Sequence, residues 1–74
     1  MNERIHNLLT LCMEAKIHFQ YWPSVDEVEI IGTDKDGKVK ADYSIKFWHD
    51  EERINRTITE AENYLKEVIA NAST

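Results

Sequence analysis

Few residues of this 74-residue chain have the side chains and the spacing that catalysis needs. The single cysteine, Cys12, falls on the apolar stripe of a predicted helix, where a thiol behaves as a small core residue. His49 and Asp50 could serve as a base and its orienting acid, but adjacent residues on a strand point to opposite faces. We therefore interpret them as a solvated pair, and we expect no enzymatic activity and no cofactor.

The chain also lacks the spacing of a metal site. The segment Asp34-Lys35-Asp36-Gly37 begins like a calcium loop, but its glycine comes too early and Tyr43 stands where the closing glutamate would lie. The histidines have no ligand spacing to one another or to Cys12. The segment is typical of a hairpin turn in which Gly37 takes the left-handed conformation. We expect no metal site.

Composition limits the kind of protein that this chain can be. Its 74 residues and 8.7 kDa suffice for one domain, which we place over residues 1–74. Fourteen acidic residues against nine basic ones give a net charge of -5, the wrong sign for a domain that binds nucleic acid directly. One cysteine, no leader-like segment and no long apolar run predict a cytoplasmic protein without a membrane partner.

Two segments have the spacing of amphipathic helices. Residues 2–15 place apolar side chains at the i, i+3, i+4 and i+7 positions of one face, which predicts a first helix. A second helix is expected to start between residues 57 and 60, where two capping boxes overlap, and to run to about residue 71. Residues 51–56 fit a first helical turn, a loop or a short fourth strand, and these alternatives stay open.

Three segments between the helices alternate apolar and polar side chains, as strands with one dry face do. They are residues 17–22, with Ile17, Phe19 and Tyr21 facing inward, residues 26–33 and residues 38–48. The sequence therefore predicts an α+β fold of helix, three-stranded antiparallel sheet and helix (αβββα) in two layers, with both helices on the dry face.

The turn between the second and third strands sets their register. A four-residue turn over residues 34–37 would place Ile30 opposite Ala41 and Val28 opposite Tyr43, so that apolar partners share one face. A three-residue turn would instead place Ile30 opposite Asp42. We therefore predict the four-residue turn.

The uncovered face of the sheet is expected to contain unusual residues. Counting alternate positions places Trp22, Ile31 and Trp48 there, although side chains of this size are usually buried. Tryptophans ringed by charges are typical of interface hot spots. Alternatively, both tryptophans fold over the sheet edge and extend the core. The first interpretation predicts a partner-binding surface formed by Trp22, Ile31, Trp48 and the acidic run Asp50, Glu51 and Glu52.

One pattern of residues extends over most of the chain. A strand closes on an aromatic pair and a proline, and a Val-Glu-Ile strand, a hairpin and a final helix follow; the quoted segments are Ile17-His18-Phe19-Gln20-Tyr21-Trp22-Pro23 and Glu60-Ala61-Glu62-Asn63-Tyr64-Leu65. This pattern resembles small accessory proteins of phages and prophages of Gram-positive bacteria, although Ser24 replaces the histidine that commonly follows the proline. The resemblance implies a small cytoplasmic protein that binds, and so blocks, a host or defence protein. It carries over no catalytic residue.

These observations lead us to expect a non-enzymatic protein-binding module. Two alternatives remain. The chain could be a self-associating structural or assembly protein, such as a homodimer, whose sheet faces or strand edges meet. It could also be an acidic mimic that competes for a nucleic-acid-binding groove on another protein.

Overall fold

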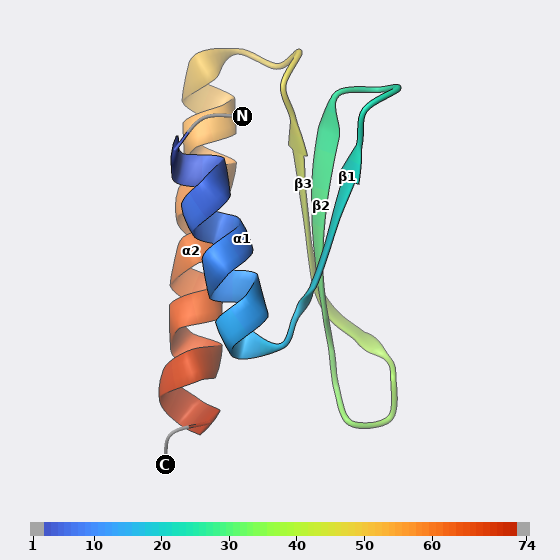
Figure 1. Cartoon of the computed structure of the whole chain (residues 1–74), viewed down its shortest axis with the longest axis vertical. Coiled ribbons are helices and arrows are strands. Elements are labelled where there is room, and N and C mark those ends of the chain that lie inside the picture. The colour runs from blue at the N-terminus through green and yellow to red at the C-terminus, as the bar shows by residue number, and fades with distance from the viewer. Residues whose placement is uncertain (1–2, 73–74) are drawn as a thin grey trace.

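A computed structural model describes residues 3–72 and has the predicted αβββα order (Figure 1). The strands form one antiparallel sheet in the order β1-β2-β3, and both helices lie on the same side of it. Among the described residues, no helix lies on the other side of the sheet. The predicted α+β fold class is confirmed. The elements are α1 (Glu3–Ala15), β1 (His18–Trp22), β2 (Glu27–Thr33), β3 (Val39–Lys46) and α2 (Glu51–Ala72).

The core lies between the helices and the sheet. Its nine members are at most 1% exposed, and each comes from the predicted apolar face of its element. Because these positions recur at helical spacing in α1 and α2 and at every second position in the strands, burying them fixes which face of each element turns inward. The nine residues are Ile5, Leu8, Cys12, Val28, Ile30, Ile45, Ile58, Ala61 and Leu65.

A Schellman motif ends α1. The amide of Ile17 donates a hydrogen bond to the carbonyl oxygen of Cys12 at 2.9 Å, and Lys16 between them has a φ of 59°. Glycine is the usual residue at this position because it has no Cβ to clash in the left-handed conformation. Lys16 therefore holds a strained backbone that turns the chain into β1.

Replacing Lys16 should show this strain directly. We expect Lys16→Gly to raise the free energy of unfolding by about 0.5 to 1 kcal/mol, since relief of a strain of about 1 to 2 kcal/mol exceeds the added freedom of the unfolded chain. Lys16→Ala removes the same charge but keeps the Cβ, so it should leave stability unchanged. Urea denaturation of both variants measures the difference. Equal stability of the two variants would contradict the assignment.

Helix α2 begins at Glu51, earlier than the predicted start between residues 57 and 60, so that prediction is wrong. Asp50 is the N-cap, because its carboxylate oxygen Oδ1 accepts a hydrogen bond from the amide of Arg53 at 2.7 Å. Glu51 and Glu52 in the first turn suit the positive end of the helix dipole. Residues 51–56 are thus the first helical turns, which settles the three alternatives left open. The helix continues through Ala72, close to the predicted end.

The two predicted capping boxes lie inside α2 and have other partners. The hydroxyl of Thr57 donates to the carbonyl of Arg53 one turn back, at 3.1 Å. Thr59 and Glu62 instead bind the side chain of Arg4 in α1. The Arg4 guanidinium donates to Thr59 Oγ1 at 3.1 Å and to Asn55 Oδ1 at 3.2 Å, and it forms an ion pair with Glu62. Arg4 therefore fixes α1 against α2.

The hairpin between β2 and β3 differs from its predicted register. The amide of Asp34 donates to the carbonyl of Lys38 at 2.9 Å, so the loop is the three residues 35–37 rather than four. Gly37 has the expected positive φ, at 84°. A β-bulge follows, because Thr33 pairs with Val39 and Gly32 with Ala41, which leaves Lys40 as the extra residue.

The bulge restores the match of apolar faces that a three-residue loop alone would break. Ile30 pairs with Tyr43 and Val28 with Ile45, two residues further along β3 than predicted. A shift of two residues keeps every side chain on its face, whereas a shift of one would have turned Asp42 inward. The predicted faces are therefore confirmed for these pairs, while the predicted partners are wrong.

Tyr64 of α2 packs closely over the end of β2. A Cβ atom at position 32 would lie 2.1 Å from the Tyr64 hydroxyl, so any residue larger than glycine would displace the Tyr64 ring. The ring of Tyr64 also lies 5.7 Å from that of Tyr43, measured between centroids. These contacts seat the C-terminal half of α2 on the sheet.

Candidate functional site

The open face of the sheet, which we define as the side away from the helices, ends in a row of one residue from each strand. Trp22 of β1 pairs with Glu27 of β2, and Glu27 pairs with Lys46 of β3. Trp22 is 43% exposed. Phe19, three residue pairs from Trp22 along β1, lies on the other face and packs on the core, as predicted. The alternation of β1 thus places Trp22 at the solvated end of the sheet.

Trp48 is close to this row but is not on β3. The strand ends at Lys46 rather than at residue 48 as predicted, because the chain turns there: the amide of His49 donates to the carbonyl of Lys46 at 3.0 Å. Trp48 is 67% exposed, and the Lys46 ammonium nitrogen lies 5.8 Å from its ring centroid. This cation–π contact keeps the Trp48 ring beside the row.

The turns that hold the two tryptophans are bonded to each other. The amide of Phe47 donates to the carbonyl of Asp26 at 3.1 Å, and Asp26 has a φ of 51°. The amide of Val25 bonds the carbonyl of Trp22 at 3.3 Å. Sequence reasoning missed Asp26, because its role depends on a contact between two turns that are distant along the chain.

His49 shares this end of the molecule with Trp48. Their rings meet edge to face with centroids 4.2 Å apart. Loss of water contact, followed by the positive charges of Arg53 and Lys46, lowers the pKa of His49 below its usual value. The ring is therefore neutral at pH 7, and it contributes an aromatic surface rather than a charge.

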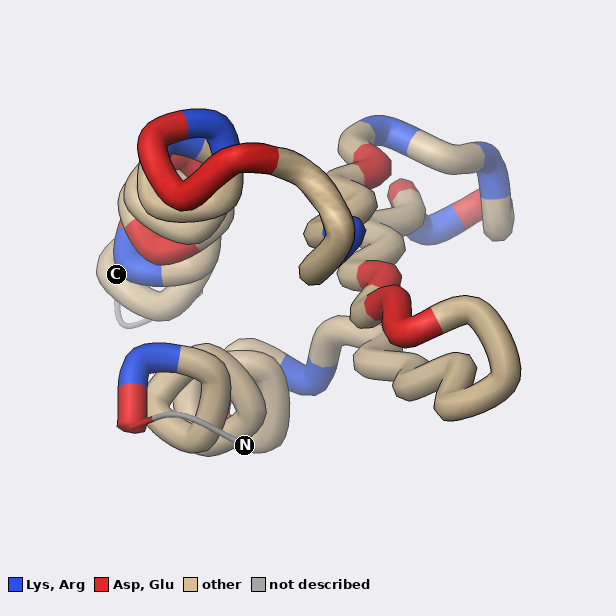
Figure 2. Tube along the Cα trace, turned by 90° about the horizontal axis from the view of Figure 1, so that it is seen from above, with Lys and Arg blue, Asp and Glu red and all other residues tan. Residues whose placement is uncertain are grey.

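The acidic run follows Trp48 and His49 in the chain and lies at the start of α2, where Figure 2 shows a red segment. Asp50 caps the helix, whereas Glu51 and Glu52 are exposed. Glu52 approaches Arg56 one turn on at 3.8 Å, a separation typical of a weak surface pair. The structure thus places five of the six predicted site residues at one end of the molecule. The five are Trp22, Trp48, Asp50, Glu51 and Glu52.

Ile31 is the exception among the predicted site residues. It lies on the open face, half-buried, but four residues along β2 from Glu27, which is about 13 Å at strand spacing. It therefore belongs to the opposite end of the sheet. The two tryptophans are not core residues, so the alternative in which they extend the core is not what the structure has.

Tyr21 lies on the inward, helix-facing side of β1, as predicted, but its side chain is not buried. It pairs with Val28 on the helix side of the sheet, yet its side chain is 44% exposed. Its face was predicted correctly, but β1 is an edge strand, and no helix or strand of residues 3–72 lies beyond it (Figure 1). Alternation predicts the face of a side chain and not whether another element covers it.

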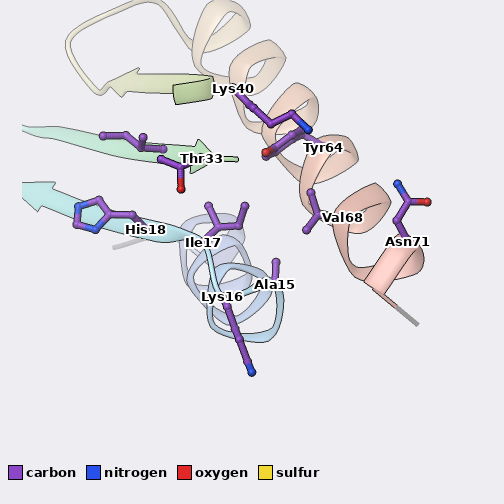
Figure 3. Close-up of a pocket in the computed structure, with 10 residues that line it drawn as sticks. Ala15, Lys16, Ile17, His18, Thr33, Lys40, Tyr64, Val68 and Asn71 are labelled. Carbon is purple, nitrogen blue, oxygen red and sulfur yellow. The ribbon is translucent and has the colours of Figure 1, made fainter. Parts of the chain in front are cut away.

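A pocket of about 470 Å³ opens at the other end of the molecule, between the ends of α1 and α2 and the hairpin (Figure 3). Ile17, Val68 and Tyr64 form apolar walls, and Lys40, which the bulge displaces, lies alongside Tyr64. Lys16 points away from the hollow. None of the lining residues is acidic. They are Ala15, Lys16, Ile17, His18, Ile31, Thr33, Lys40, Tyr64, Val68 and Asn71.

Groups for other chemistry are sparse in the part of the chain that the structure describes. Among residues 3–72, no three His, Cys, Asp or Glu side chains gather as metal ligands would. Within the same range, no helix has both the length and the apolar content to cross a membrane. Cys12 is 1% exposed, and burial raises the pKa of its thiol to about 11.

No protein-family model, curated protein or solved structure was found to match the chain. The resemblance to phage accessory proteins therefore stays a prediction. The candidate site consists of two exposed tryptophans on linked turns, with acidic residues beside them.

Cys12 should react slowly with a thiol reagent in the folded protein. A pKa of about 11 instead of 9.0 reduces the thiolate population about 100-fold at neutral pH, and burial blocks access as well. We expect labelling at least about 100-fold slower than in the chain unfolded by urea. Cys12→Ala combined with Met13→Cys is the positive control, since Met13 is exposed on the same helix. Equal rates for native and unfolded Cys12 would contradict the packing of α1.

Proposed function

We propose that the chain is a non-enzymatic module that binds another protein through its aromatic end, defined as Trp22, Glu27, Lys46 and Trp48. The observation that carries the proposal is the exposure of both tryptophans in a small chain whose core is closed without them. Tryptophan is rarely exposed on protein surfaces but is common at interface hot spots. At an interface, its large rigid ring buries much area and loses little conformational entropy.

The surroundings of the aromatic end favour a partner with a basic rim. Glu51 and Glu52 lie on one side of it and Asp26 on another, all exposed. Of the basic residues nearby, Lys46 lies against the Trp48 ring and Arg53 lies near His49. An apolar centre with an acidic border complements an apolar pocket bordered by Arg or Lys. Such complementary charges increase the association rate and suppress binding to other partners.

The proposed mode of action is occlusion. The aromatic end is built from turns and strand ends, and Asp50 to Glu52 extend it to the start of α2. A module that covers a basic or apolar surface of its partner blocks that surface without chemistry. The resemblance to phage accessory proteins supports the same mode and would make the partner a host or defence protein.

Removing both tryptophans should separate binding from folding. We expect the double variant Trp22→Ala/Trp48→Ala to keep its melting behaviour, since exposed residues away from caps usually change stability by about 0.5 kcal/mol or less. It should lose measurable affinity for the partner. Val39→Ala, which removes a side chain that is 63% exposed at the far hairpin, is the matched control and should bind normally.

The measurements are a circular-dichroism melt and a titration. A partner captured from the organism that encodes the chain is identified, purified and titrated with wild type, Trp48→Ala, the double variant and Val39→Ala. Unfolding of the double variant would show that the tryptophans are structural. Unchanged affinity in a folded double variant would locate the binding surface elsewhere, and either result refutes the proposal.

A further inference from the structure

Charge is distributed unequally between the two flanks of the molecule (Figure 2). The flank of β3 and α2 is charged: α2 alone contains eight acidic or basic residues. The flank of β1 and α1 is nearly neutral. Strand β1 contains no Asp, Glu, Lys or Arg, and the only charged residues of α1 are Glu3, Arg4 and Glu14.

The two edges of the sheet differ in the same way. Strand order makes β1 and β3 the edges, and each edge presents backbone N–H and C=O groups that no strand within residues 3–72 pairs. The β3 edge has the features that discourage strand addition: a bulge, and lysines at positions 40 and 46. The β1 edge, His18-Phe19-Gln20-Tyr21-Trp22, has no charged residue, proline or bulge. It is open to pairing with another strand.

Helix α1 presents an exposed apolar side chain on this same flank. Arg4 points to α2, and Ile5, Leu8 and Cys12 point into the core. At 100° per residue, Met13 lies on the side of α1 opposite Arg4, which is the side toward the β1 edge. Met13 is 72% exposed. Exposed apolar groups therefore occur at both layers of one flank: Met13 in the helix layer, Tyr21 and Trp22 in the sheet.

We propose that the chain forms a homodimer in which β1 pairs antiparallel with β1 of a second copy, making one continuous six-stranded sheet with four helices on one side. A two-fold axis through Gln20 places Phe19 opposite Tyr21 of the partner subunit on the helix face. The same axis places His18 opposite Trp22 of the partner subunit on the open face. Aromatic pairs of this kind stabilise neighbouring strands.

A second copy fits this flank better than a strand from another protein. A foreign strand covers the backbone edge but leaves Met13 in water. A copy brings its own α1 beside its own β1, so the two-fold axis covers the helix layer and the sheet layer together. The net charge of -5 on each copy opposes association, but the charged flank of β3 and α2 lies on the far side of both subunits.

The first test compares lysine at the two edges of one row. Gln20 pairs with Glu29, and Glu29 pairs with Ser44, so positions 20 and 44 lie in the same row of the open face and both are half-buried. Sedimentation equilibrium of the full chain should give about twice 8.7 kDa. Gln20→Lys places two like charges opposite each other across the axis and should raise the dimer dissociation constant at least about tenfold. Ser44→Lys, at the far edge, should leave it unchanged.

The second test addresses the helix layer and uses surface positions that do not endanger folding. Met13→Lys should weaken the dimer, whereas Asn7→Lys, exposed on the same helix but pointing away from the flank, should not. Trp48→Ala should leave the mass unchanged, which separates this proposal from the proposed function. A wild-type chain that stays monomeric at about 1 mM overturns the dimer. The assigned interface is also overturned if Gln20→Lys and Ser44→Lys, or Met13→Lys and Asn7→Lys, change the dimer dissociation constant equally.

Discussion

The chain has enough apolar surface to cover one face of its sheet and no more, and this constraint governs the rest of the structure. Two helices on a three-stranded sheet close a core of nine buried side chains, all on the same side. A chain of this length buries only about 60% of its unfolded surface. The opposite sheet face and both sheet edges are therefore exposed, and every surface on which function could depend belongs to that remainder.

The constraint of one dry face explains why so much of the fold could be predicted. Period-two alternation assigns Val28, Ile30 and Ile45 to the core whatever the exact turn, because a register that mixed the faces would bury Asp42. The partners could not be predicted, because the three-residue loop and the compensating bulge at Lys40 together yield the same parity as a four-residue loop. The alternation of side chains along a strand determines which sheet face each one lies on, and both turn geometries give the same faces.

The start of α2 was mispredicted for a related reason. Ser, Thr and Asp are all common N-cap residues, so the sequence does not show whether Asp50, Thr57 or Thr59 begins the helix. In the fold their partners differ: Asp50 accepts from the Arg53 amide, Thr57 donates to the Arg53 carbonyl, and Thr59 and Glu62 bind Arg4 of the other helix. Similarly, alternation predicted Trp22 on the open face. Trp48 is held near it by a turn and by Lys46 rather than by strand geometry.

Charge segregation connects the two proposed surfaces. In the two-fold dimer the β1 strands run antiparallel, so the Trp48 turns of the two subunits lie at opposite ends of the joined sheet. Both turns flank the same uncovered face, because the axis is perpendicular to the sheet and keeps all helices on one side. The dimer would therefore be bivalent, and a partner that presents two sites would be held at an effective concentration set by the rigid sheet rather than by a linker. The neutral residues on the flank of β1 and α1 permit the two β1 strands to pair. The acidic residues beside the aromatic ends favour a partner protein with a basic surface.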